Sequence, residues 1–122
     1  MEDQKPILGL IEEVIICDSE GNERKILAKI DTGADSCSID LDLASELSVG
    51  PIIKTKSVVS SHGRSLRPVV NMKIILAGME VEDNFTIYNR SHMSYKILIG
   101  RNLLRKGFLI DPSKNEYKGV KK

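Results

Sequence analysis

The feature that most constrains the fold of this chain is a short alternating strand that runs directly into an Asp-Thr-Gly-Ala sequence at 31–34. In the stretch 25–30, Ile26, Ala28 and Ile30 fall on one face by a period of two, and Lys29 lies on the opposite face. This period of two is typical of a strand with one buried side. The glycine that follows Asp31 by two residues lets the backbone bend sharply. We therefore expect a tight loop that presents Asp31 at the end of a strand.

The composition favours one β-rich domain over 1–122, with a core at about 5–112 and a polar tail at 113–122. Apolar residues make up 41% of the chain and there is no Trp, so the core must come from Ile, Leu and Val, which favour strands. No apolar stretch reaches the roughly 18 residues that cross a bilayer, and the first residues lack the order of a secretion signal. We expect a soluble, cytoplasmic protein with no membrane partner.

Cys17 and Cys37 are expected to be free buried thiols, with a bridge as the alternative.

Turn-forming residues divide the chain into strands and two short helical segments. A hairpin is expected from 6–17 and 23–30 around a polar turn at 18–22. A second is expected from 52–60 and 66–76 around 61–65. Asp40 is an N-cap candidate for a helix over 40–47 that ends before Gly50-Pro51. The other expected elements are strands at 80–88, 96–99 and 108–112, a polar loop at 89–95 and a helical turn at 100–106.

Charge is strongly segregated along the chain although the net charge is only +1. Residues 1–46 hold 12 acids and 4 bases, whereas 47–79 hold bases and no acid. The bases of this acid-free segment are Lys54, Lys56, Arg64, Arg67 and Lys73. The asymmetry fits an acidic ligand or nucleic acid, or simply solvated strand faces, and the residues leave this open. Near-neutral charge and the lack of interleaved aromatic residues disfavour nucleic acid, so no such partner is expected.

The loop at 31–34 has the chemistry of half an aspartic peptidase site. Such a site needs two carboxylates that share one proton, because like charges in contact cannot both ionise, and the pair holds a water molecule as nucleophile. Asp31 supplies one carboxylate, and a second copy related by a twofold axis would supply the other. Thr32 offers a hydroxyl for hydrogen bonding, Gly33 permits close approach and Ala34 keeps the apex narrow. Asp-Thr-Gly also occurs in ordinary turns, so the tripeptide alone does not establish catalysis.

A second motif, Ile-Leu-Ile-Gly-Arg-Asn-Leu-Leu at 97–104, strongly resembles the strand, glycine and helix that retroviral proteases and their cellular relatives place behind the aspartate loop. The resemblance to the retropepsin-like aspartic peptidase family covers about 23–112. It implies an all-β, closed β-barrel with a flap hairpin and one or two short helices.

The resemblance also implies roles for individual residues. Asp31 would be the catalytic aspartate, and Thr32 and Gly33 would complete the catalytic loop. Ala34 and Asp35 would contact bound peptide, with Asp35 as a backbone anchor and Arg101 as its partner.

The segments 63–70 and 108–113 are similar to small prokaryotic members of the family that are labelled ATP-dependent zinc proteases. The residues support neither half of that label: no phosphate-cradling glycine loop is present, and the Cys and His residues lack zinc-site spacing. No cofactor or metal is therefore expected. Some members of this group are linked to ATP-grasp ligases that add glutamate tails to a ribosomal protein, and to the trimming of those tails.

An acidic peptide is therefore the favoured substrate. The hairpin would lie over the cleft and present Arg64, Arg67, Lys54 or Lys56 to carboxylates, which Arg captures well. His62 and Gly63 at its tip are further substrate-contact candidates, although His62 also fits an exposed turn. Solvent-facing strand positions remain the alternative for the basic residues.

The leading hypothesis is a homodimeric aspartic endopeptidase in which paired Asp31 residues activate water under the hairpin. The alternative is a non-catalytic retropepsin-like module that binds peptides or mediates dimerisation, because a fold can persist after its chemistry is lost.

Overall fold

Strands account for most of the regular structure, as the Ile, Leu and Val content predicts. The structure is a computed structural model that describes residues 4–61 and 63–114. Its elements in chain order are β1 (Ile7–Leu8), β2 (Ile11–Cys17), β3 (Glu23–Ile30), β4 (Cys37–Asp40), α1 (Leu41–Leu47), β5 (Ile52–Ser60), β6 (Gly63–Leu76), β7 (Met79–Tyr88), β8 (Ile97–Ile99), α2 (Arg101–Leu104) and β9 (Leu109–Ile110).

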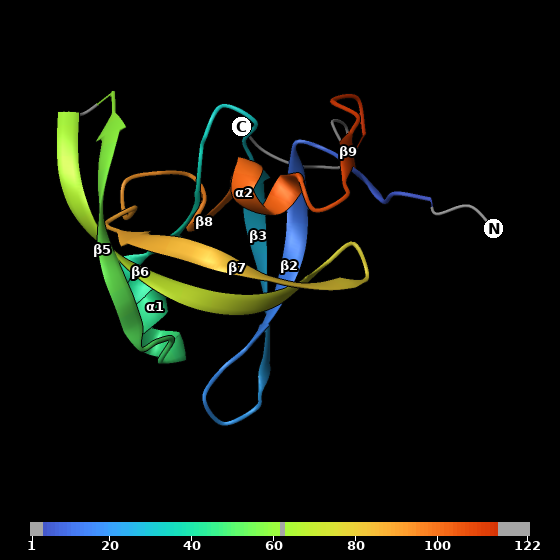
Figure 1. The fold of residues 1–122 in the computed structure, drawn as a ribbon. Helices are drawn as coiled ribbons and strands as arrows, with labels where there is room; N and C mark the ends of the chain where they lie inside the picture. The colour runs from blue at the N-terminus through green and yellow to red at the C-terminus, as the bar shows by residue number, and fades with distance from the viewer. Residues whose placement is uncertain (1–3, 62, 115–122) are drawn as a thin grey trace.

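The main sheet closes on itself. Its strand order is β2-β3-β8-β4-β7-β6-β5, and β6 also pairs with β2 through Val14↔Leu76 and Ile15↔Ile75. The six strands β2, β3, β8, β4, β7 and β6 therefore form a closed barrel. The strand β5 pairs only with β6 and remains outside this ring (Figure 1). The predicted closed β-barrel with a hairpin and two short helices is confirmed.

Alternate side chains of the strands point into the barrel and form its core. In β3, Ala28 and Ile30 are buried while Lys29 is exposed, as the period of two predicts. Fully buried Phe85 from β7 packs in the same apolar cluster as residues of the other strands. Each such aliphatic or aromatic side chain contributes roughly 1.5–3 kcal/mol when it leaves water. This core holds the strand ends that carry the candidate site.

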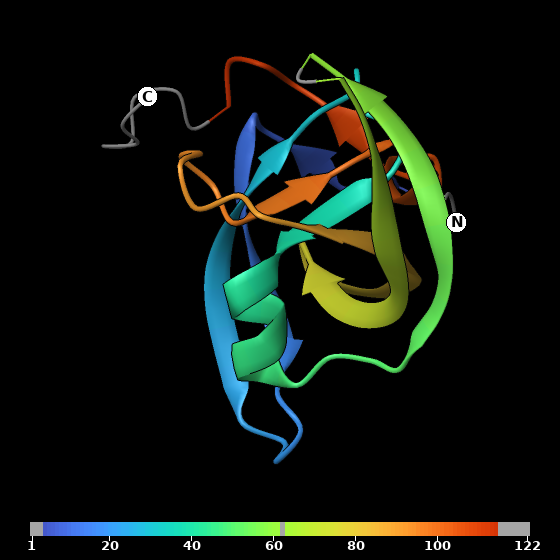
Figure 2. The ribbon, with the colours of Figure 1, turned by 90° about the vertical axis from the view of Figure 1, so that its left-hand side faces the viewer.

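The hairpin of β5 and β6 extends beyond the barrel as an arm (Figures 1 and 2). Its register runs from Ile52↔Val70 to Ser60↔Gly63, so the strands continue further than the predicted turn at 61–65 allows. Gly63 has φ +103°, a left-handed conformation that favours glycine, and this lets the chain turn within two residues. The position of His62 lies outside the described residues.

Two elements differ from the sequence-based expectation. The strand predicted at 6–17 is broken at Gly9, and its first part, β1, pairs in parallel with β9 in a separate two-stranded sheet. The strand β4 was missed because it is only four residues long; its sequence, Cys-Ser-Ile-Asp, alternates, but all four residues are buried because neighbouring elements cover both of its faces. The first hairpin, the helix capped by Asp40, and the strands β7 to β9 lie close to where they were predicted.

Both cysteines are free, but only one is buried. Cys37 lies in the core, whereas Cys17 is exposed at the end of β2, so the prediction of a buried Cys17 was wrong. Most of the predicted polar tail lies outside the described residues. Among the residues that are described, no helix is long and apolar enough to span a membrane.

Candidate active site

Parallel pairing of β3 with β8 brings the two sequence motifs together. Ile30 is in register with Ile99, so the residues that follow, Asp31 and Gly100, leave the sheet side by side. The main-chain N of Asp31 donates a hydrogen bond to the Ile99 carbonyl oxygen at 2.9 Å. In Figure 1 the loop after β3 and the helix α2 lie at the same end of the barrel, where the hairpin arm also ends.

Gly100 lies against the backbone of the aspartate loop. A Cβ atom at this position would be 2.6 Å from the Ser36 carbonyl oxygen and 2.9 Å from that of Ala34. The main-chain N of Arg101 donates to the Ala34 carbonyl oxygen at 2.8 Å, immediately beside this contact. The glycine is therefore needed for α2 to approach closely enough to bond the loop.

The loop itself is a closed turn with the Asp31 carboxylate at its base. The main-chain N of Gly33 donates to Asp31 Oδ1 at 2.9 Å, and that of Ala34 donates to the Asp31 carbonyl oxygen at 3.2 Å. Asp31 is half-buried, whereas Thr32 and Gly33 at the crest are exposed. One chain thus supplies a carboxylate that is held by the loop backbone, next to two exposed residues.

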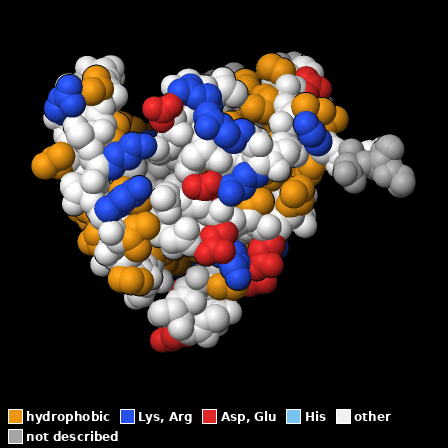
Figure 3. All heavy atoms as spheres, in the orientation of Figure 1, with side chains coloured by type: hydrophobic (Ala, Val, Ile, Leu, Met, Phe, Trp, Pro, Cys, Tyr) orange, Lys and Arg blue, Asp and Glu red, His pale blue; other side chains and the backbone are white. Residues whose placement is uncertain are grey.

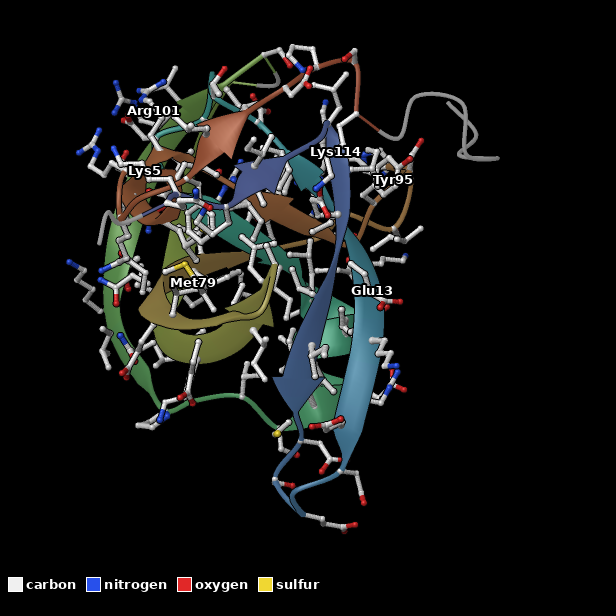
Figure 4. All side chains as sticks on the ribbon, turned by 90° about the vertical axis from the view of Figure 1, so that its right-hand side faces the viewer. Lys5, Glu13, Met79, Tyr95, Arg101 and Lys114 are labelled. Carbon is white, nitrogen blue, oxygen red and sulfur yellow. The ribbon has the colours of Figure 1, made fainter. Side chains whose placement is uncertain are left out.

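Arg101 ties the crest of the loop to α2. Its guanidinium donates to the Thr32 carbonyl oxygen at 2.8 Å and forms an ion pair with the Asp35 carboxylate. Figure 4 shows Arg101 at the end of the barrel opposite the turn between β2 and β3. The structure thus places Asp35 and Arg101 together at the rim of the loop.

Asn102 is a positioning residue that the sequence analysis missed. Its side-chain oxygen accepts a hydrogen bond from the Cys37 main-chain N at 3.0 Å. Its side-chain nitrogen donates to Asp83 Oδ1 at 3.0 Å and to the Asn84 carbonyl oxygen at 2.9 Å. These bonds join the end of the aspartate loop, α2 and β7, contacts that no local pattern reveals.

The two faces of the hairpin differ in what they meet. Lys56 and Arg67 are in register and lie on the face turned toward the barrel, where Lys56 Nζ donates to Ser36 Oγ at 2.6 Å. Arg64 is exposed on the other face and donates to Ser57 Oγ at 3.1 Å. Lys54 is also exposed. The inner face thus brings Lys56 and Arg67 toward the aspartate loop, and Arg64 points away from it.

Basic side chains gather around the hollow between the hairpin arm and the barrel (Figure 3). Two further basic residues are buried: Arg67 lies in β6, and Arg90, which the sequence analysis placed in a polar loop and did not single out, follows β7. Thr86, Tyr88 and Arg90 are each two positions apart. If the period of two in β7 is continued past Tyr88, Arg90 falls on the same face as Tyr88, and this was the sequence signal that could have identified it.

No group of His, Cys, Asp or Glu residues that could hold a metal ion is present among residues 4–61 and 63–114. A cavity of about 290 Å³ lies elsewhere, between the end of β2, the end of α1 and the middle of β6. It is lined by none of the predicted site residues.

Comparison with known proteins gives a family and a fold. A family model described as retropepsin-like aspartic endopeptidase RimB (RimB-like) matches residues 42–121, well over half of the chain. The matched segment contains the hairpin and Arg101 and begins after Asp31. The crystal structure of Lpg0085, a Legionella pneumophila protein of unknown function (DUF785), matches with a TM-score of 0.63 and 23% identity, over 89% of this chain and 95% of that chain. That likeness shows a shared fold. No curated protein matches the chain.

Proposed function

The chain belongs to the RimB-like family of retropepsin-like aspartic endopeptidases, and from this premise we propose that it hydrolyses peptide bonds with Asp31 as its catalytic aspartate. The observation that carries the proposal is the placement of the Asp31 carboxylate in a closed turn that Gly100 and Arg101 hold from behind. Catalytic groups need such fixed geometry, since a small misplacement costs a large factor in rate.

We propose a homodimer, because one chain supplies one Asp31. A twofold axis through the loop crest would bring a second Asp31 beside the first, and closed twofold dimers are the commonest assemblies. The exposure of Thr32 and Gly33 supports this arrangement, since the crest is free to meet a second copy. The two carboxylates would share one proton and hold a water molecule between them.

In this mechanism the ionised carboxylate removes a proton from the water as it attacks the peptide carbonyl carbon. The protonated carboxylic acid donates to the carbonyl oxygen, and a proton then passes to the leaving nitrogen as the C–N bond breaks. The hairpin would lie over the peptide, with its inner face toward Asp31. The contact between Lys56 and Ser36 supports this placement, since it links that face to the aspartate loop.

We propose acidic or glutamate-rich peptides as substrates. The acid-free segment 47–79 contains the whole hairpin, and Lys56 and Arg67 lie on the hairpin's inner face. Carboxylates on the peptide would meet these cations where water is partly excluded, so the attraction is stronger than on an open surface. The cytoplasmic location expected from the sequence stays a prediction.

The test is mass-spectrometric cleavage of a peptide panel that includes oligoglutamate tails, from pH 4 to 8. Wild-type protein is compared with Asp31→Asn, and Asp42→Asn serves as a matched control because Asp42 is exposed on α1. We expect cleavage by wild-type and Asp42→Asn proteins and none by Asp31→Asn, with all three equally folded by circular dichroism.

Two outcomes would contradict the proposal. Turnover retained by Asp31→Asn would exclude this mechanism. Cleavage of no peptide by the wild-type protein, when it is folded and dimeric, would instead favour a non-catalytic module that binds peptides.

A further inference from the structure

Two guanidinium groups are nearly buried beside the aspartate loop without a carboxylate partner. Arg67 is 8% exposed and Arg90 is 6% exposed. Within the described part of the chain, the ion pairs engage Arg24, Lys73, Arg101, Lys106 and Lys114, and neither of these two arginines. A buried charge is costly unless it is paired, so two such groups together point to a negative charge supplied from outside the chain.

Arg67 is held by Tyr88. Its guanidinium carbon lies 3.7 Å from the centroid of the Tyr88 ring, and its Nε donates to Ser65 Oγ at 3.1 Å. Stacking on an aromatic face fixes the plane of a guanidinium and leaves the N–H groups along its edge available for hydrogen bonds. The side chain is therefore oriented before any ligand arrives.

Arg90 is held from behind by Asp40 and Tyr95. Its main-chain N donates to Asp40 Oδ1 at 2.7 Å, and its Nε donates to the Tyr95 carbonyl oxygen at 2.9 Å. These contacts use none of the terminal nitrogens, which have no hydrogen-bond acceptor among the described residues. The planar end of Arg90 is thus free to bind a ligand through two parallel hydrogen bonds.

Arg90 is subject to the charges of Arg67, Asp40 and Asp31. Burial lowers the pKa of both guanidinium groups, and the charge of Arg67 lowers the pKa of Arg90 further. Asp40 and Asp31 act in the opposite direction on the Arg90 pKa. The position of the pair follows from the geometry: Arg67 is in register with Lys56, which bonds Ser36 of the aspartate loop, and Arg67 stacks on Tyr88, two residues before Arg90.

We propose that Arg67 and Arg90 form a carboxylate-binding subsite beside Asp31, which takes one carboxylate of the bound peptide. The carboxylate comes from a glutamate or aspartate side chain or from the C-terminus of the peptide. This inference rests on the proposed function, because it assigns a part of the same cleft. Lys56 lies beside Arg67 and adds positive charge to this part of the cleft, but its ammonium group lacks the planar fork that binds a carboxylate through two parallel hydrogen bonds.

The test measures binding separately from cleavage. Asp31→Asn protein, which is expected to bind without turnover, is titrated into fluorescent peptides that differ only by Glu or Gln at one position. A second pair differs only by a free or an amidated C-terminus. We expect about a ten- to hundredfold tighter Kd for the acidic member of one pair, as for a charge-assisted hydrogen bond in a partly buried site. The pair that shows the preference identifies the source of the carboxylate.

Arg67→Gln and Arg90→Gln, each added to Asp31→Asn, should reduce this preference to nearly none and leave the affinity for the neutral peptide almost unchanged. Arg67→Lys keeps the charge but not the planar fork, so it should keep only part of the preference. Arg105→Gln, the same change at an exposed arginine at the end of α2, is the matched control. Circular dichroism verifies that each variant is folded.

The proposal is overturned if the preference for the acidic peptide survives in both Gln variants, or if Arg64→Gln on the outer face removes it equally. A purely structural role would weaken binding of acidic and neutral peptides alike. Failure of the proposed function gives a different result, because folded wild-type protein would then cleave no peptide while the binding preference could still be measured.

Discussion

Gly100 is the residue at which packing behind Asp31 leaves the least room. Its backbone has no left-handed φ, so alanine is excluded by contact with the carbonyl oxygens of Ser36 and Ala34 and not by conformation. Gly100→Ala should lower the free energy of unfolding by about 1–3 kcal/mol, the usual cost of overpacking. It should also abolish peptide cleavage, because α2 and the aspartate loop must move apart.

Urea denaturation and the peptide assay measure these two effects. Arg105→Ala is a control on the same helix, since Arg105 is exposed. Full activity and unchanged stability in Gly100→Ala would show that the loop accommodates the methyl group and that its packing is not tight.

The two cysteines should differ in reactivity. Burial raises the pKa of the Cys37 thiol to about 12, so at pH 8 almost none of it is the reactive thiolate. Cys17 is exposed. Iodoacetamide at pH 8 should therefore modify native protein once, at Cys17, and urea-unfolded protein twice, as counted by mass spectrometry. Rapid double modification of the native protein would contradict the burial of Cys37.

At the scale of elements, Asp40 connects α1 to the segment that carries Arg90. Its Oδ2 accepts from the main-chain N of Asp42 at 3.1 Å and of Leu43 at 3.3 Å, and its Oδ1 accepts from Arg90. Burial alone would raise the pKa of Asp40, but these hydrogen bonds and the charge of Lys96 together hold it below its usual value of 3.8. The ionised carboxylate therefore stabilises the folded state.

Asp40→Asn should lower the free energy of unfolding at pH 7 by about 1–2 kcal/mol, because the carboxylate accepts main-chain hydrogen bonds through both oxygens, whereas asparagine has one acceptor oxygen and would turn its NH2 group toward a main-chain N–H. Because the pKa is depressed in the folded protein, the contribution of Asp40 is present above the unfolded value and is lost as pH falls through the lower folded value. The stability difference between wild-type and Asp40→Asn proteins should thus stay constant above about pH 5 and shrink toward pH 3.

Urea titrations at pH 7, 5, 4 and 3 measure this difference, with Asp42→Asn as a control at a neighbouring exposed position. A difference that grows as the pH falls would have the wrong sign for a depressed pKa and would contradict the assignment.

Local signals predicted the elements that have local causes. The polar turn at 18–22 joins β2 and β3, and the Asp40 cap starts α1, because both depend on residues within a few positions. The break before β2 was missed, since the apolar pattern continues across it and only pairing with β9 separates β1. The burial of β4 likewise comes from its neighbours β7 and β8.

At the scale of the whole molecule, the candidate site is made by contacts between distant segments. Asp31 was identifiable from its motif, but its placement beside Gly100 depends on parallel pairing of β3 with β8, which only the family resemblance implied. Arg90 is held in place by hydrogen bonds to Asp40 and Tyr95. Asn102 is bonded to the main chain of β7. No periodicity or propensity contains such long-range contacts, so these residues required the structure.

The assembly of the whole molecule yields the last prediction, because the proposed site is shared between two chains. Wild-type and Asp31→Asn chains are mixed in equal amounts and allowed to exchange. About a quarter of the dimers then contain two intact Asp31 residues, so activity per wild-type chain should fall to about half. Mixed dimers are inactive because one carboxylate cannot share its proton with an equivalent partner.

Native mass spectrometry of isotope-labelled chains verifies the exchange, and mixing with Asp42→Asn provides the control, in which activity per chain should not fall. Undiminished activity per wild-type chain after complete exchange would mean that one Asp31 suffices. The catalytic unit would then be a single chain, and a second acidic group within it would have to take the place of the partner's carboxylate.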